Sequence, residues 1–240
     1  SVAVYRSTVD ADYALNGVVS SRSIMGVTQT ALRAARPGVI DAGPVLEVKL
    51  SSGSLESVSK EALLNGANLA AIGDGSADRW ELFQFQEAQL VAPATYWLTG
   101  RLRGQAGSDG LMPEAWPVGS RFVLMNGTPQ QVEFSPHLRR VAQHYRIGPA
   151  RRPVDDPSYL HQVHAFDGNG LRPYSPCHLR AEALPGGDIT FSWIRRTRID
   201  GDAWDGPEVP LGEESERYLL RVFAGGQHLR DVLLDTPGGT

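Results

Sequence analysis

The chain has 240 residues, of which 41% are hydrophobic and 21% are charged, and its formal net charge is −4. This is enough apolar sequence for one large domain or two small ones, and it excludes a disordered chain. The mild acidity argues against nucleic-acid binding, which depends on clustered positive charge. No run of about 18 apolar residues is present, so we expect no membrane span.

The chain has the pattern of an all-β protein. Its 26 glycines and 16 prolines are spread over the whole length, and short alternating segments lie between them. In "VLEVKL" (45–50), Leu46, Val48 and Leu50 fall on one face. Helix is scarce, and residues 57–66 are the best candidate, with Ser57 or Ser59 as the cap. We expect strands at 2–6, 18–32, 45–50, 68–73, 79–90, 94–104, 121–125 and 130–134.

The second part begins after a Pro-rich, charged segment at 135–158, which has the composition of a linker or crossover. We therefore expect a β-rich domain over 1–138, a linker with extended strands over 139–174 and another β domain over 175–240. Strands are expected at 160–166, 177–184, 188–196, 216–223 and 227–234.

Pairs of reactive residues do not form a catalytic or metal-binding arrangement. Cys177 and His178 are adjacent in an expected strand, so their side chains point to opposite faces and cannot act together. The spacing of His161 and His164 also splits the two faces of a strand. No G-x-S-x-G motif is present. We expect no catalytic residue, no metal and no cofactor.

Two loops resemble ligand-binding motifs only in part. "DGDAWDG" (200–206) has the acids of a calcium loop, but Trp204 and Asp205 occupy its fifth and sixth positions. "RLRGQAGSDG" (101–110) is basic and Gly-rich, but it lacks the spacing of a phosphate loop. Both are interpreted as turns, in which the glycines supply positive-φ positions.

The stretch "FSWIRRTRIDGDAW" (191–204) is dense in tryptophan and arginine. Alternation places Phe191 and Trp193 on the core face, and we expect the arginines to pair with glutamates at 213, 214 or 216. Tryptophan and arginine are enriched at the contact surfaces of proteins. The candidate interface residues are Trp97, Arg101, Arg103, Trp116, Arg195, Arg196, Arg198 and Trp204.

Two long stretches carry a resemblance to a known family. Residues 63–110 contain a Leu-Asn-Gly turn, a Trp-Glu strand ending in Gln-Phe and a Leu-Arg-Gly-Gln run followed by Gly107. They resemble the C-terminal region of the large baseplate, or host-specificity, protein of gene transfer agents and tailed phages, as do residues 2–7 and 48–57. Residues 174–222 resemble the segment after the fibre-binding domain of that family and the start of a fibronectin type III-like sandwich.

The resemblance implies a fold for each part. Residues 1–138 are expected to form a fibre-binding-like β-barrel or sandwich, and 175–240 a fibronectin type III-like sandwich with Trp193 in its core and Tyr218 on the third strand. Such a sandwich has about 100 residues, whereas only 66 run from Ser175 to Thr240. We therefore expect an incomplete last domain. The start of the chain resembles no signal peptide and lacks an initiator Met, so we expect a piece of a longer protein.

The resemblance also implies a structural role without catalysis. The expected function is a component of a tail baseplate or tail tip, made in the bacterial cytoplasm, that docks tail fibres or other baseplate proteins and supports adsorption to the host. The chain is also a candidate to form a homo-oligomer in the assembled tail. The alternative is a carbohydrate-binding module for a host-cell glycan, with Tyr96, Trp97 or Trp116 exposed in a groove. A third hypothesis is a metal-dependent adhesion domain that uses Asp200, Asp202 and Asp205.

Overall fold

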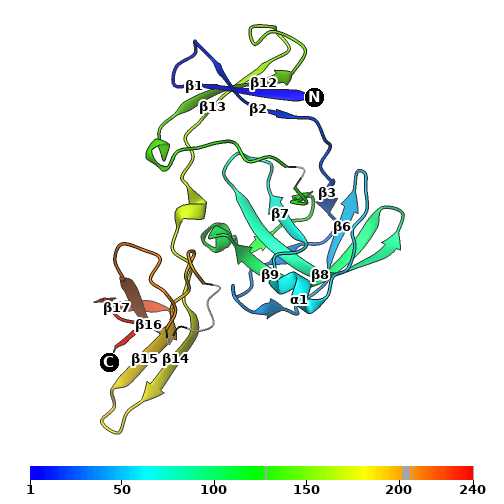
Figure 1. Cartoon of the computed structure of the whole chain (residues 1–240). Coiled ribbons are helices and arrows are strands. Elements are labelled where there is room, and N and C mark those ends of the chain that lie inside the picture. The colour runs from blue at the N-terminus through cyan, green and yellow to red at the C-terminus, as the bar shows by residue number, and fades with distance from the viewer. Residues whose placement is uncertain (128, 202–205, 207, 240) are drawn as a thin grey trace. The chain divides into compact units, whose positions relative to one another are not determined.

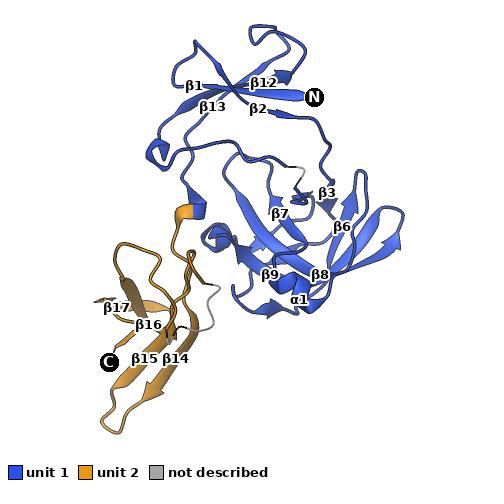
Figure 2. Ribbon diagram, in the orientation of Figure 1, with its two compact units in different colours: residues 1–170 blue, residues 171–240 orange. Residues whose placement is uncertain are grey.

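The computed structural model describes residues 1–127, 129–201, 206 and 208–239 (Figure 1). The chain divides into two compact units, residues 1–170 and 171–240 (Figure 2). Nearly all of the regular structure is β-strand, which confirms the all-β prediction.

The centre of the first unit is a closed barrel of six antiparallel strands, which confirms the barrel alternative of the fold prediction. The sheet order is β9-β6-β3-β11-β7-β8, and pairing between β8 and β9 closes it. Closure leaves no long unpaired strand edge in the barrel. The six strands are β3 (Met25–Thr28), β6 (Leu46–Leu50), β7 (Leu69–Gly73), β8 (Trp80–Ala92), β9 (Thr95–Gln105) and β11 (Arg121–Leu124).

Short strands extend the barrel at its rim. β5 (Ile40–Asp41) pairs with β9, and β4 (Leu32–Arg33) pairs with β10 (Ala115–Trp116). A 3-10 turn, η1 (Ser108–Leu111), follows β9. These rim elements bring Arg33, Asp41 and Trp116 close to the charged residues of β8 and β9.

The barrel core is apolar and aromatic. Leu46, Val48 and Leu50 are all buried, as the alternation of β6 predicts. Phe122 contacts Phe83 and Phe85 with ring centroids 6.2 and 6.4 Å apart. Burial of each such side chain contributes about 1.5–3 kcal/mol to folding.

The short helix of the chain, α1 (Lys60–Leu64), lies inside the range predicted for it. Ser59 caps its start, since its hydroxyl accepts a hydrogen bond from the Ala62 N–H at 3.1 Å. Leu63 is fully buried, and the Gln84 side chain of β8 donates to its carbonyl at 2.7 Å. The cap and this contact hold a helix of barely one turn against the barrel.

A separate four-stranded sheet completes the first unit, in the order β13-β12-β1-β2. Residues 139–174, expected as a linker, supply two of its strands. The predicted strand at 130–134 is wrong, because these residues have no regular structure. The four strands are β1 (Val2–Ser7), β2 (Ala14–Val19), β12 (Gln143–Pro149) and β13 (Leu160–His164).

Tyr159 packs tightly on this sheet. A Cβ at Gly148 would lie 2.6 Å from the Tyr159 ring, so glycine is required there. The Tyr159 hydroxyl donates to the Pro149 carbonyl at 3.0 Å, and its ring meets Tyr5 edge-on at 5.9 Å. The contact fixes the loop between β12 and β13 over the sheet.

The second unit contains two small sheets. β14 (Cys177–Ala183), β15 (Ile189–Ile194) and β18 (Gly238–Gly239) form one, and β16 (Tyr218–Ala224) and β17 (Gln227–Leu234) form the other. Trp193 is buried, and its ring meets that of Tyr218 edge-on at 5.0 Å. Trp193 is therefore a core residue, as alternation predicts.

Candidate functional site

Four charged side chains form a buried network in the barrel. Arg103 donates from Nε to Glu81 Oε1 at 2.7 Å and from Nη2 to Glu81 Oε2 at 2.9 Å. Arg101 donates from Nε to Asp41 Oδ2 at 3.0 Å, and Arg103 Nη1 lies 3.4 Å from the same oxygen. Two positive and two negative groups thus compensate one another, as buried charges must.

Further donors and acceptors complete this network. The Trp116 indole donates to Glu81 Oε2 at 2.7 Å, and the Gly104 N–H donates to Glu81 Oε1 at 3.2 Å. Arg103 Nη1 also donates to the Arg33 carbonyl at 2.6 Å. The network therefore joins β4, β5, β8, β9 and β10.

Three residues predicted for an interface belong to this network, which corrects the prediction. Arg101 is 1% exposed, Arg103 is fully buried and Trp116 is 1% exposed. Their charges and N–H groups are satisfied inside the barrel, so none of them presents a surface to a partner. Arg101 and Arg103 are instead paired with acidic residues inside the barrel.

Two glycines flank the buried arginines of β9. Residues 101–104 are all buried, although a regular strand would expose every second one. Gly100 and Gly104 flank the pair with φ of 62° and 61°, which favours glycine. A Cβ at Gly104 would lie 2.5 Å from Asp109 Cβ. Gly104 therefore permits the close approach of β9 to Asp109.

Asp41 is ionised within the network. Burial tends to raise the pKa of its carboxyl, but the Gly43 N–H and the Arg101 guanidinium outweigh burial, so the pKa lies below its usual value. The Gly43 N–H donates to Asp41 Oδ1 at 2.8 Å. Asp41 is the anionic partner that Arg101 requires.

Trp97 is the predicted barrel residue that does lie at the surface. It is 41% exposed, and its indole donates to Glu47 Oε2 at 2.8 Å. Near the β8–β9 turn, Leu90 is 61% and Val91 36% exposed. Trp97 pairs with Gln89 and Leu90 pairs with Tyr96, so Leu90 and Trp97 lie on opposite faces of this hairpin. By contrast Tyr96 is 7% exposed, so the groove of Tyr96, Trp97 and Trp116 expected for glycan binding is not formed.

Two arginines of the second unit pair with glutamates, as predicted. Arg195 Nη1 lies 2.9 Å from Glu216 Oε2, and Arg198 Nε lies 2.8 Å from Glu213 Oε1. Arg196 lies over the ring of Tyr174, 4.9 Å from its centroid. These contacts give the three arginines structural partners.

Asp202, Trp204 and Asp205 lie outside the described residues. They belong to the stretch 191–204 and the loop at its end. The interface prediction for Trp204 and the hypothesis of a metal-dependent adhesion loop with Asp200 therefore stay predictions.

Tyr218 links the arginine–glutamate pairs to the core of the second unit. Its hydroxyl donates to Glu216 Oε1 at 2.6 Å, while its ring packs on Trp193. Burial and the hydrogen bond to Glu216 raise the pKa of Tyr218 to about 12. The phenol therefore stays protonated across the neutral range.

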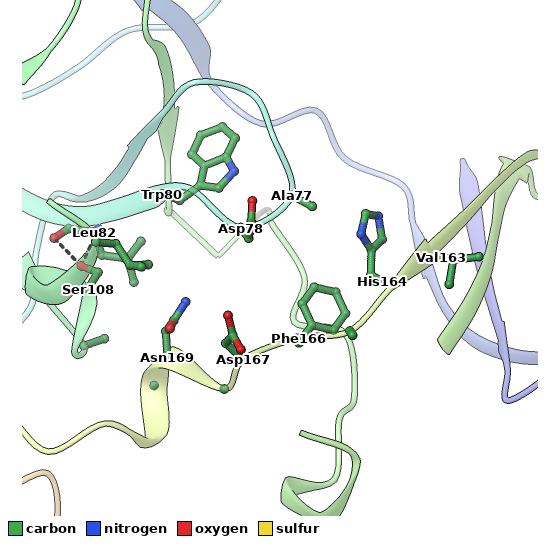
Figure 3. A pocket seen from close by; sticks show the side chains of 15 residues that line it. Ala77, Asp78, Trp80, Leu82, Ser108, Val163, His164, Phe166, Asp167 and Asn169 are labelled. Carbon is green, nitrogen blue, oxygen red and sulfur yellow. Dashed lines mark hydrogen bonds between the residues drawn. The ribbon is translucent and has the colours of Figure 1, made fainter. Parts of the chain in front are cut away.

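A pocket of about 560 Å³ lies in the first unit (Figure 3). Its wall combines apolar groups with a few polar ones, as small-ligand pockets do. Ser108 is engaged with the backbone, since its hydroxyl accepts from the Leu82 N–H at 2.8 Å and donates to the Gln105 carbonyl at 2.6 Å. The lining side chains include Asp78, Trp80, Leu82, Ser108, His164, Phe166, Asp167 and Asn169.

His161 and His164 lie on opposite faces of β13, as their spacing predicts. His164 contacts the ring of Tyr145 at 6.2 Å, whereas His161 contacts His144 at 5.3 Å. The missed residue is His144, which β12 brings beside His161. No local signal marks this pair, because it depends on strands that are 17 residues apart.

No helix in the described part of the chain is long and apolar enough to cross a membrane.

The comparisons with known proteins concern the barrel. A comparison with curated proteins found no match for the chain. Residues 23–123 match the family model described as "Rcc01698-like, C-terminal". That range contains every barrel strand except the last residue of β11. The barrel is therefore similar to the C-terminal domain of Rcc01698-like proteins.

Proposed function

We propose that this chain is a structural, protein-binding part of a phage-like tail baseplate or tail tip. In this role it docks tail fibres or neighbouring baseplate subunits and supports adsorption of the particle to a host cell. The resemblance of residues 63–110 and 174–222 to baseplate and host-specificity proteins supports the proposal. The family match over residues 23–123 overlaps the first of these stretches.

The exposure of Trp97 is the observation that carries the proposal. Trp97 exposes an aromatic ring on the barrel wall, and two exposed apolar residues lie near the end of the same hairpin. Binding energy at protein interfaces concentrates in a few such side chains, with tryptophan the most enriched. The charged residues of the barrel interior are engaged in ion pairs, which favours a scaffold over a catalytic site.

A pull-down with the tail-fibre protein of the same gene cluster tests this function. We expect capture at about 10 μM, a concentration at which modest interfaces register. Trp97→Ala should weaken capture about tenfold or more. Val118→Ser is the matched control, because Val118 is an apolar residue of the same barrel with 62% exposure. Absence of capture by the unchanged protein would count against the proposal.

Glycan binding remains a second candidate because of the pocket in the first unit. Trp80 and Phe166 supply aromatic rings there, and Asp78 and Asn169 supply polar groups (Figure 3). Aromatic rings with a few hydrogen-bonding groups are suited to sugars. A glycan array is the test. Binding that is lost in Asn169→Ala would favour this function, and a blank array would remove it.

A further inference from the structure

Two histidines share one face of the four-stranded sheet. His161 of β13 lies opposite Arg146 of β12, and His144 is two residues from Arg146 on the same strand. Residues opposite each other, and those two positions away, lie on the same face of an antiparallel pair. The register of the sheet therefore places the two imidazoles side by side, and the backbone pairing fixes this placement.

The loop between β1 and β2 adds a carboxylate to this face. Asp10 Oδ1 lies 3.8 Å from His161 Nε2 and 3.3 Å from Arg146 Nη2. The Tyr13 hydroxyl donates to the same oxygen at 2.5 Å, and Arg146 lies over the Tyr13 ring at 5.1 Å. Tyr13 and Arg146 thus hold Asp10 against the sheet from the outside, as outer-shell residues hold a metal ligand.

The three ligand atoms have the spacing of a metal site. His144 Nδ1 lies 3.1 Å from His161 Nε2, and one ligand atom from each of the three residues falls within 4.8 Å of the other two. Metal–ligand bonds of about 2.0–2.1 Å in a tetrahedral site place ligand atoms roughly 3.3 Å apart. The observed spacing therefore requires only small side-chain movements around an ion.

We propose that Asp10, His144 and His161 bind a divalent transition-metal ion, with Zn²⁺ as the best fit. Neutral imidazole suits Zn²⁺, and two histidines with one carboxylate form a three-ligand set that leaves a coordination position open. The site goes beyond the proposed structural function. An ion here would join the β1–β2 loop to β12 and β13.

The positive charge of Arg146 repels an incoming cation. The Asp10 carboxylate, however, can contact Arg146 and the cation at the same time. In the described part of the chain, the contacts recorded for Asp10 all use Oδ1. A carboxylate has two oxygens with about four lone-pair positions. Arg146 and Tyr13 can therefore keep their hydrogen bonds while Oδ2 takes the ion.

Cobalt and zinc titrations of the full chain, free of any affinity tag, test this site. We expect Co²⁺ to bind one to one with the visible absorption of a four-coordinate complex, and Zn²⁺ to displace it. His144→Ala, His161→Ala and Asp10→Asn should each weaken binding about tenfold or more, since even outer-shell changes cost 10–100-fold. Circular dichroism of each variant shows whether it is folded.

His228→Ala is the matched control. His228 is an exposed histidine hydrogen-bonded to Asp231 at 2.6 Å, but it belongs to the second unit. Its loss should leave the Co²⁺ affinity unchanged. The proposal is overturned if the unchanged protein binds neither ion at about 100 μM, if both His144→Ala and His161→Ala keep their affinity, or if His228→Ala loses it.

Discussion

Arg103 donates hydrogen bonds to both carboxylate oxygens of Glu81, at 2.7 and 2.9 Å, with both side chains fully buried in the barrel. A pair of this kind adds little over well-packed apolar residues when it is intact. Removal of one partner, however, leaves an unpaired charge in the interior. The pair therefore makes the barrel sensitive to small chemical changes at these two positions.

Glu81→Gln should destabilise the first unit by about 3–5 kcal/mol, because Arg103 then faces a neutral amide. Urea unfolding measures the change. Glu87→Gln is the matched control, since Glu87 lies on the same strand but is exposed. We expect it to stay within about 0.5 kcal/mol of the unchanged protein. Equal effects of the two substitutions would show that the buried pair is not decisive.

Trp116→Phe should cost about 2 kcal/mol. It removes the indole N–H that donates to Glu81 Oε2 at 2.7 Å, and hydrogen bonds to charged groups contribute about 1.5–3 kcal/mol. Combined with Glu81→Gln, the loss should be less than the sum of the two, because the variants share one contact. A double-mutant cycle by urea unfolding measures this coupling, and strict additivity would contradict it.

Gly104→Ala should destabilise the barrel more than Gly119→Ala does. Both glycines have positive φ, 61° and 85°, so each alanine adds backbone strain of about 1–2 kcal/mol. Only at Gly104 would the new Cβ also clash, at 2.5 Å from Asp109 Cβ; at Gly119 nothing lies within 4 Å. Thermal unfolding of the two variants compares them. A milder effect at Gly104 would contradict the close approach described for β9.

The stability of the second unit should fall as the pH rises from about 10 to about 12. Tyr218 has a folded-state pKa raised to about 12 from an ordinary 10, so its contribution is fully present below 10 and is lost through this window. Chemical unfolding at several alkaline pH values measures the slope. Tyr218→Phe should make the slope shallower. An unchanged slope would mean that other groups cause the loss of stability.

The strands that alternate regularly were accessible from the sequence. β6 and the core position of Trp193 follow their period of two, and the Ser59 cap marks the start of α1. The pairing of Arg195 and Arg198 with nearby glutamates also followed from charge and distance along the chain.

The features that could not be predicted depend on contacts between different segments of the chain. The alternation of β9 gives no sign that Arg101 and Arg103 are buried, because their partners Asp41 and Glu81 come from other strands. The partner of β1 is β12, more than 130 residues later in the chain. The grouping of His144 with His161 follows from the pairing of β12 with β13 and not from any local motif.

The most direct test of the central claim is the location of the chain in purified phage-like particles from the producing cells. Gold-labelled antibodies against the chain, imaged by electron microscopy, should mark the distal end of the tail. Particles of a deletion strain are the control and should carry no label. Labelled particles without a preference for the tail end, or protein found only outside particles, would contradict a role in the baseplate or tail tip.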